Sequence, residues 1–150
     1  MELLKALADK ILTLDGAMGT ALIAKGAKGA LEQCNVENAA LVEAVHTEYL
    51  EAGADIITTN TTCADALCLE PYGLQSRSYE LALAGAKLAR QAADRYTTAE
   101  KPRYVAGSVG PTTRNLTLAN DVKREDVAAA YAEVVRGLLD GGVDMILIET

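Results

Sequence analysis

EAGADII, residues 51–57, recurs in altered form as DGGVDMI at residues 140–146. In both copies a helical stretch ends at glycine, an aspartate follows, and an apolar run begins. Glycine commonly ends helices because it adopts the left-handed conformation without a steric cost, and alternating helices and strands are typical of β/α folds. The second copy runs on to residues 147–150, which indicate a strand with a polar tip. We therefore expect the chain to form the first part of a larger closed sheet.

The periodicity of the remaining sequence predicts further strands and helices. Apolar residues at helical spacing, such as Val127, Val134 and Leu138, indicate amphipathic helices, and short apolar runs bounded by Gly or Pro indicate strands. A loop with spaced glycines is expected from Gly16 to Gly29. The expected strands cover residues 11–14, 54–59, 103–109 and 143–148, and the expected helices cover residues 2–9, 76–96, 123–140 and a stretch from a cap at Asn35 or Asn38 to residue 52.

This order of elements predicts the fold class. Strands separated by helices require parallel pairing with right-handed crossovers. The runs at residues 54–59 and 143–148 are apolar almost throughout, as in strands buried on both faces. We predict an α/β fold, the N-terminal half of a (βα)8 TIM-type barrel with four parallel strands and three covering helices. An open doubly wound sheet is the alternative. No linker interrupts residues 1–150, so one domain is expected.

The charge of the chain excludes some partners. Its formal net charge is −7 at pH 7, and nucleic acid and anionic membranes both repel negative charge. No apolar run approaches the roughly 20 residues needed to span a bilayer, and the first residues lack the pattern of a signal peptide. We expect a cytoplasmic protein that binds neither nucleic acid nor membrane.

The three cysteines and the single histidine do not suggest a metal site. Cys63 and Cys68 are five residues apart, which on a continuous helix places them about 140° from each other. That separation is poor for binding one metal ion, so these two and Cys34 are expected to be ordinary buried or half-buried thiols. His46 lies in the middle of an expected helix, far from any strand tip. A role in helix packing is expected for it.

Polar residues end each predicted strand, and ligands of parallel β/α folds bind at the carboxyl ends of the strands. Asp15 follows the first strand, and Glu149 ends the fourth. Two carboxylates at one edge would suit a cation such as the ammonium of an amino acid, held by charge-assisted hydrogen bonds. The alternative is a helix-capping aspartate and a solvated glutamate. The turn at residues 16–19 permits close backbone approach to a ligand but lacks a dinucleotide fingerprint.

Four strings along the chain resemble, in order, the motifs of the homocysteine S-methyltransferase family. They are LDGAMGT at residues 14–20, YLEAGADII at 49–57 with TNT at 59–61, KPRYVAGSVGPT at 101–112, and GVDMILIET at 142–150. The third string is similar to that of one branch, the cobalamin-dependent methionine synthases. Thr62 stands where the family usually has an aromatic residue.

The resemblance implies a zinc-dependent (βα)8 barrel that transfers a methyl group from methylcobalamin to homocysteine, giving methionine. Residues 1–150 would be the first half of the homocysteine-binding domain. Asp15 and Glu149 match carboxylates that hold the homocysteine amino group, and Gly16, Ala17 and Asn60 would line the same pocket. The zinc cysteines of the family lie in the second half of the barrel, and no residue here matches them.

The same resemblance implies several partners and leaves alternatives open. Besides homocysteine, the expected partners are the rest of the barrel or a second chain, and the cobalamin and folate modules of a full-length enzyme. Betaine and S-methylmethionine enzymes share this barrel, so other methyl donors remain alternatives. A different function is an inactive half-barrel that binds small amino acids or assembles as a homo-oligomeric scaffold. An unrelated small-molecule β/α module is the third hypothesis.

Overall fold

The computed structural model describes residues 2–114 and 122–150. This part of the chain contains a parallel sheet of three strands in the order β1-β2-β3. The elements in chain order are α1 (Glu2–Asp9), α2 (Met18–Ala24), η1 (Leu31–Gln33), α3 (Cys34–Glu37), α4 (Ala39–Glu51), β1 (Ile56–Thr58), α5 (Ala66–Leu69), η2 (Glu70–Tyr72), η3 (Gln75–Arg77), α6 (Ser78–Tyr96), β2 (Tyr104–Val109), α7 (Arg124–Asp140) and β3 (Met145–Ile148), where η marks a 3-10 helix.

The strand predicted over residues 11–14 is wrong. Only Leu14 bridges to Ile56, in parallel register, while Asp15 donates its backbone N–H to the Ile56 carbonyl at 2.9 Å. Ile11 is 95% exposed, so no neighbouring element covers the start of this segment. The described sheet therefore has three strands where four were predicted, with the residues around Leu14 paired only at its β1 edge.

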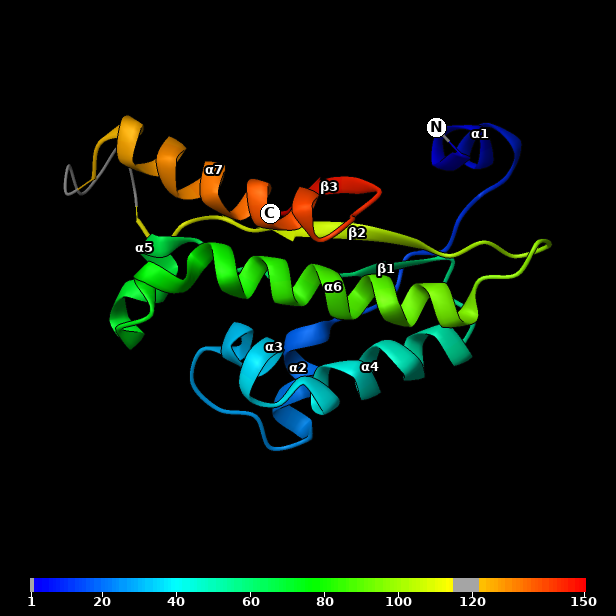
Figure 1. The fold of residues 1–150 in the computed structure, drawn as a ribbon, viewed down its shortest axis with the longest axis horizontal. Helices are drawn as coiled ribbons and strands as arrows, with labels where there is room; N and C mark the ends of the chain where they lie inside the picture. Colours follow the sequence, from blue (N-terminus) through cyan, green and yellow to red (C-terminus); the bar gives the residue numbers. More distant parts are fainter. Residues whose placement is uncertain (1, 115–121) are drawn as a thin grey trace.

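One face of the sheet packs against the helices that connect or follow the strands. Ile57 of β1 and Val105 of β2 are buried with residues of α4 and α6, and Val109 of β2 is buried with residues of α6 and α7. In Figure 1 these three helices run side by side along the sheet. A doubly wound sheet carries its crossover helices on both faces, so this one-sided arrangement differs from that alternative.

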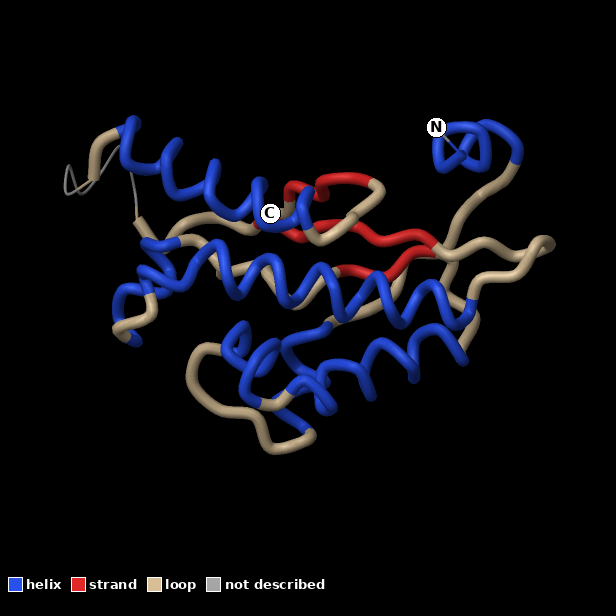
Figure 2. Tube along the Cα trace, viewed as in Figure 1, coloured by secondary structure: helices blue, strands red, loops and turns tan. Residues whose placement is uncertain are grey.

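The opposite face of the sheet packs against α1 alone among the described helices. Leu3 of α1 is buried with Ile56, Tyr104 and Ala106, and Met145 is partly buried against them. Figure 2 shows α1 set apart from the other helices and joined to them by a loop. The helix predicted over residues 2–9 is confirmed as α1.

Small residues let α6 and α7 approach closely. Ala82 and Ala86 of α6 are fully buried, in the same cluster as Val134 and Leu138 of α7. A side chain at Gly137 of α7 would place its Cβ 2.8 Å from the backbone oxygen of Tyr79. Since real Cβ atoms do not come so close to backbone, glycine is required at this contact.

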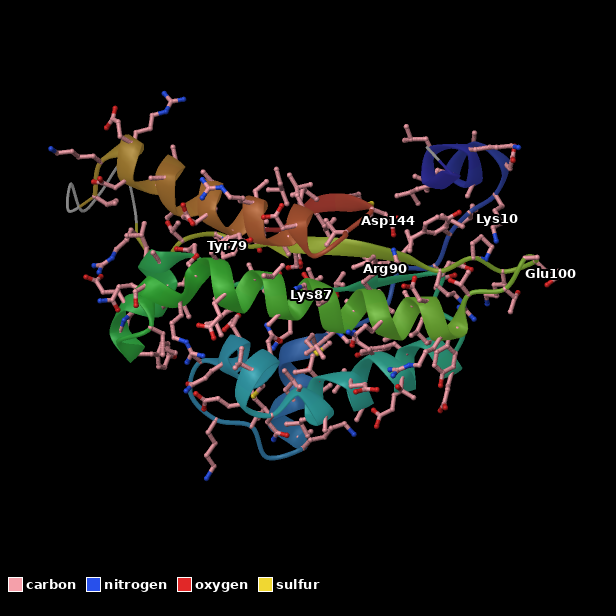
Figure 3. All side chains as sticks on the ribbon, in the orientation of Figure 1. Lys10, Tyr79, Lys87, Arg90, Glu100 and Asp144 are labelled. Atoms are coloured by element: carbon pink, nitrogen blue, oxygen red, sulfur yellow. The ribbon has the colours of Figure 1, made fainter. Side chains whose placement is uncertain are left out.

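The repeated segment, at residues 51–57 and 140–146, forms the predicted junctions between helix and strand. Gly53 has φ +108° and Gly142 has φ +86°, so both use the left-handed conformation that favours glycine. At the second junction Arg90 of α6 forms an ion pair of 2.8 Å with Asp144, which precedes β3. Both are labelled in Figure 3, where Asp144 lies near the loop that enters β3. Helix, glycine, aspartate and strand therefore follow one another as expected.

Of two further expectations about the first third of the chain, one is wrong and the other is confirmed in part. The glycine-spaced loop from residue 16 to 29 contains the helix α2, which buries Met18 and Leu22. Asn38 occupies the cap position of α4 but makes no side-chain capping bond. Asn35 lies within α3 and is buried with its side chain directed to other bonds, described below. Tertiary packing has overridden the local capping preference at Asn35.

Candidate functional site

A cleft of about 370 Å³ lies at the carboxyl ends of the strands and brings the turn at residues 16–19 together with Glu149. Gly16, Ala17, Asn60 and Glu149, which the resemblance assigns to the substrate pocket, line it. Asp15 does not line it, but its carboxylate binds Thr58, which does. The other lining residues are Met18, Gly19, Thr20, Leu31, Glu32, Thr58, Thr59, Thr62 and Cys63.

Asp15 is held by two hydrogen bonds from the end of β1. The Thr58 backbone N–H donates to Oδ2 at 2.8 Å, and the Thr58 hydroxyl donates to Oδ1 at 3.0 Å. Burial raises the pKa of Asp15 to about 6; the bonds from Thr58 oppose this rise, and the charge of Glu149 adds to it. This repulsion acts on Asp15 although Glu149 is 134 positions away in the printed sequence, and a cation between the two would relieve it.

Glu149 is held by a chain of hydroxyl groups. The Ser108 hydroxyl donates to Glu149 Oε1, and the Thr62 and Ser108 hydroxyl oxygens are 2.7 Å apart. Because Ser108 has one hydroxyl proton and gives it to the carboxylate, Thr62 must donate to Ser108. Nothing in the sequence pattern assigned this role to Thr62.

Asn60 is positioned by a buried amide pair. Its side-chain nitrogen donates to the Leu31 carbonyl at 2.8 Å and to Asn35 Oδ1 at 3.0 Å. The Asn35 side-chain nitrogen in turn donates to the Asn60 carbonyl at 2.8 Å and to the Leu81 carbonyl at 3.0 Å. The donors of both amides are therefore used inside the protein, so only the Asn60 oxygen is left for a ligand. Sequence reasoning missed Asn35, which it treated as a possible helix cap.

Gly16 serves close packing in the cleft wall. A Cβ at this position would lie 2.8 Å from the Tyr49 hydroxyl oxygen and 2.9 Å from a ring carbon. The Tyr49 hydroxyl donates to the carbonyl of Ala17 at 3.2 Å. Gly16 does not have a positive φ, so glycine is needed here for space and not for backbone conformation.

The cleft wall is acidic. Glu32 and Glu149 both line it, and no lining residue is Lys or Arg. Glu32 is buried, its Oε1 accepts the Cys63 backbone N–H at 2.9 Å, and burial raises the pKa of its carboxyl. Such a surface favours a positively charged group on a ligand.

The cysteines and histidine do not form a metal site. Among residues 2–114 and 122–150, no group of three or more His, Cys, Asp and Glu side chains could hold a metal ion. His46 is fully buried in α4, and burial lowers its pKa to about 4, consistent with the packing role predicted for it. The zinc implied by the resemblance therefore does not fit the described residues.

The expected separation of Cys63 and Cys68 is wrong. Cys63 precedes α5 and Cys68 lies within it, so the assumption of one continuous helix fails. Whereas the Cys63 thiol lies before the helix, the Cys68 thiol donates to the Pro111 carbonyl at 3.6 Å. Both line a second cavity of about 290 Å³, next to the acidic cleft.

The sequence model of a family described as Homocysteine S-methyltransferase matches residues 12–150. The chain belongs to the homocysteine S-methyltransferase family. The four motifs that suggested this family all begin within the matched residues.

Two curated relatives in this family are methionine synthases. The chain is 38% identical over 157 aligned residues to the methionine synthase of Mycobacterium leprae and 37% identical to that of Mycobacterium tuberculosis. Each alignment covers 99% of this chain and 13% of the relative. The chain thus spans about an eighth of the length of these methionine synthases.

Solved structures of the homocysteine methyltransferase MmuM from Escherichia coli have a similar fold. The metallated form superposes with a TM-score of 0.80 at 34% identity, covering 97% of this chain and 56% of that one. The apo form superposes with a TM-score of 0.70 at 35% identity. The chain therefore corresponds to about half of an MmuM chain. None of the helices in the described residues is long and apolar enough to cross a membrane.

Proposed function

We propose that residues 1–150 are the first half of a homocysteine-binding (βα)8 barrel and hold the amino-acid end of homocysteine. Asp15 and Glu149 would bind its ammonium group, while Gly16, Ala17 and Asn60 line the pocket around it. The observation that carries the proposal is that Glu149 and Thr58, which holds Asp15, line the same cleft at the strand tips. Family membership supplies homocysteine as the substrate class.

The hydrogen bonds of the two carboxylates support an anchoring role. Thr58 fixes Asp15, and Ser108 fixes Glu149, so both side chains are already ordered before a ligand binds. Hydrogen bonds from a buried cation to fixed acceptors are stronger than those to solvated acceptors, because charge-assisted hydrogen bonds gain strength in a low dielectric. A ligand held by its ammonium in this cleft would have its side chain free to extend towards a reacting group.

The reacting group itself is not assigned to this chain. Zinc does not fit the described residues, so thiol activation is expected to depend on residues outside residues 1–150. What this chain's residues do is bind and orient the amino acid. The donor we propose is methylcobalamin, with methionine as the product, on the strength of the methionine synthase relatives and the string at residues 101–112.

The unpaired edge of the sheet at β3 supports the proposal that a further part of the barrel packs there. Ile148 of β3 is 83% exposed, and no strand among the described residues pairs beyond β3. The relatives are longer than this chain, with 44% of the metallated MmuM chain lying outside its match. We propose that the remaining barrel half, on the same or another chain, covers this edge, and that cobalamin and folate modules act with the full-length enzyme.

Calorimetric titration with L-homocysteine tests the proposed anchor. The matched ligand is 4-mercaptobutanoic acid, which keeps the thiol and the carboxylate but lacks the amino group. We expect Glu149→Gln to weaken L-homocysteine binding by roughly tenfold or more, because a charge-assisted bond contributes about 1.5–3 kcal/mol. The same substitution should leave the weak binding of the amine-free ligand unchanged.

A variant of an exposed glutamate separates this effect from a general change in charge. Glu133 lies on α7 and pairs with Arg136, so Glu133→Gln alters the net charge equally without touching the cleft. Equal loss of L-homocysteine affinity in Glu133→Gln and Glu149→Gln would contradict the anchor. Methionine formation by the 150-residue chain alone would contradict the assignment of the reacting group to another part of the enzyme.

A further inference from the structure

Asn60 carries a hydrogen-bond acceptor at the acidic cleft that the described residues leave unused. The residue is only 5% exposed, yet it lines the cleft. Its side-chain nitrogen gives its two hydrogens to the Leu31 carbonyl and to Asn35 Oδ1. No group among residues 2–114 and 122–150 donates to Asn60 Oδ1. Because buried polar atoms normally have partners, this oxygen indicates a donor that a ligand supplies.

Asn35 determines which end of the Asn60 amide faces the cleft. The Asn60 nitrogen donates to the Leu31 carbonyl at 2.8 Å. The Asn35 nitrogen donates to the carbonyls of Asn60 and Leu81 at 2.8 and 3.0 Å. Backbone carbonyls only accept, so turning either amide round would set its oxygen against a carbonyl oxygen. Asn35 is 3% exposed and does not line the cleft, so it is a positioning residue that reaches a ligand only through Asn60.

The two carboxylates of the proposed anchor also present acceptors. The Thr58 backbone N–H and hydroxyl both donate to Asp15, and the Ser108 hydroxyl donates to Glu149. Since these partners are all donors, each ionised carboxylate keeps its remaining lone pairs for a ligand. Asp15, Glu149 and Asn60 Oδ1 together make three side-chain acceptors. A primary ammonium group has three N–H donors, which is the same number.

We propose that Asn60 Oδ1 is the third acceptor for the ligand's ammonium group, and that the cleft thereby selects a primary ammonium over an N-methylated one. This inference rests on the proposed function, in which Asp15 and Glu149 bind that ammonium. A primary ammonium has one N–H for each acceptor. An N-methyl group replaces one N–H, so one acceptor that the ligand covers is left without a donor. Such an unpaired buried group weakens binding although the positive charge is kept.

Calorimetric titration of the 150-residue chain with L-homocysteine and with N-methyl-L-homocysteine measures this selectivity. Both ligands carry the thiol, the carboxylate and one positive charge on nitrogen. We expect L-homocysteine to bind at least about tenfold more tightly. Equal affinities would overturn the proposal. In that case weaker L-homocysteine binding by Glu149→Gln would still support the carboxylate anchor, whereas unchanged binding by Glu149→Gln would show that the anchor itself is wrong.

An Asn60→Leu variant separates hydrogen bonding from steric exclusion of the N-methyl group. Leucine keeps the branched shape of asparagine and is no smaller, so it cannot relieve a clash, but it offers no acceptor. The two carboxylates that remain match the two N–H donors of the methylated ammonium. The preference for L-homocysteine should therefore fall to less than about threefold, chiefly because L-homocysteine binds more weakly. An unchanged preference would assign the selectivity to space and contradict the third acceptor.

Asn35→Ala tests the positioning role and leaves Asn60, the residue that touches the ligand, in place. Without Asn35 the Asn60 amide loses one of the two acceptors that fix its direction, so the preference for L-homocysteine should fall by at least about threefold. Binding of 4-mercaptobutanoic acid, which has no ammonium, should stay the same. A general loss of stability would not alter the ratio of the two amine affinities, so a parent-like ratio would reject the positioning role. This variant also decides the matter if Asn60→Leu does not fold.

Lys87→Ala is the matched control for the two variants. Lys87 is exposed on α6 and does not line the cleft, so this substitution should keep the parent ratio of affinities for the two amines. An equal change of that ratio in Lys87→Ala and Asn35→Ala would show that the amide pair is not its cause.

Discussion

Asp144 repeats at β3 the contact that Asp55 makes at β1. The Asp55 backbone N–H donates to the Thr13 carbonyl at 2.9 Å, and the Asp55 carboxylate accepts the Thr13 N–H at 2.9 Å. Asp144 makes the same reciprocal pair with Val105, at 2.9 and 2.7 Å. In each case the side chain continues the strand pairing by one hydrogen bond where the backbone ladder begins. This shared contact is a physical reason for the repeated phrase in the sequence.

Removing the Asp144 carboxylate should therefore destabilise the fold. Asp144→Ala leaves the N–H of the buried residue Val105 without its partner, which costs about 1–3 kcal/mol of unfolding free energy. Urea denaturation measures the change. Asp94 is the matched control, because it pairs with the same Arg90 at 2.9 Å but is 65% exposed and belongs to a surface pair. Asp94→Ala should cost less than about 0.5 kcal/mol; an equal cost for both variants would assign the effect to Arg90.

The sequence predicted the junctions of the fold better than its first segment. The apolar runs around Ile57 and Val105 and the glycine at position 53 are strong local signals, and each corresponds to a strand or a helix end in the structure. The segment at residues 11–14 has the composition of a strand, but Ile11 is 95% exposed and Leu14 alone bridges to Ile56. The apolar composition of the segment is therefore not enough to extend the pairing with β1.

The site was predictable only where strand tips supply the residues. Asp15 and Glu149 follow apolar runs, and parallel pairing brings such ends to one edge. The roles of Asn35 and Thr62 depend on side-chain contacts across 25 and 46 positions, between Asn35 and Asn60 and between Thr62 and Ser108. No periodicity encodes contacts of this kind, so they emerge only from the packed structure.

Removing the Glu149 charge should lower the pKa of Asp15. That pKa is about 6, chiefly because of burial, with a smaller contribution from Glu149, so Glu149→Gln should move it part of the way towards its ordinary value. Carbon-detected NMR titration of the Asp15 carboxyl group measures this directly. Glu133→Gln should leave the titration unchanged. An unchanged or higher pKa in Glu149→Gln would mean that the two carboxylates are not coupled.

The raised pKa of Asp15 also sets a pH dependence for ligand binding. An ammonium group gains from Asp15 only when that carboxylate is ionised, so affinity for L-homocysteine should rise as pH rises through about 6. Calorimetry measures this affinity at a series of pH values from about 5 to 7.5. Buffers of different ionisation enthalpy are used to correct for the heat of protonation. Asp15→Asn should bind more weakly and lose this rise. If the affinity of the parent chain stayed constant through this pH range, Asp15 would not be a binding partner of the ligand's ammonium group.

His46 should weaken the fold in acid. Its folded pKa is lowered to about 4 by burial, and both ring nitrogens lack partners among the described residues. The unfolded state therefore binds the proton first, so stability is lost as pH falls from about 6.5 through 4, by about 3 kcal/mol in total. His46→Leu, of similar volume, should remove this loss. Protonation of Asp15 in the same pH range has the opposite effect and stabilises the folded state. The quantity to compare at each pH is therefore the difference in unfolding free energy between the parent chain and His46→Leu, in which the contribution of Asp15 cancels.

Gly85 of α6 makes room for the Asn35 amide that positions Asn60. A Cβ at Gly85 would lie 2.7 Å from the Asn35 nitrogen and 2.8 Å from Thr61 Cγ2. Alanine normally favours a helix over glycine by about 1 kcal/mol, yet here Gly85→Ala should destabilise the chain by about 1–3 kcal/mol through overpacking. Urea denaturation gives the value. Lys87→Ala, an exposed change on the same helix, should remain within about 0.5 kcal/mol of the parent chain.

A double-mutant cycle locates the cause of that loss. In the Asn35→Ala background the clashing amide is absent, so Gly85→Ala should cost less than it does in the parent chain, with an interaction energy of at least about 0.5 kcal/mol. Additive costs would place the strain at Thr61 instead, since that contact survives in both backgrounds. A stabilising Gly85→Ala in the parent chain would show that the amide pair can shift without loss. In that case Asn60 would not be rigidly held at the cleft.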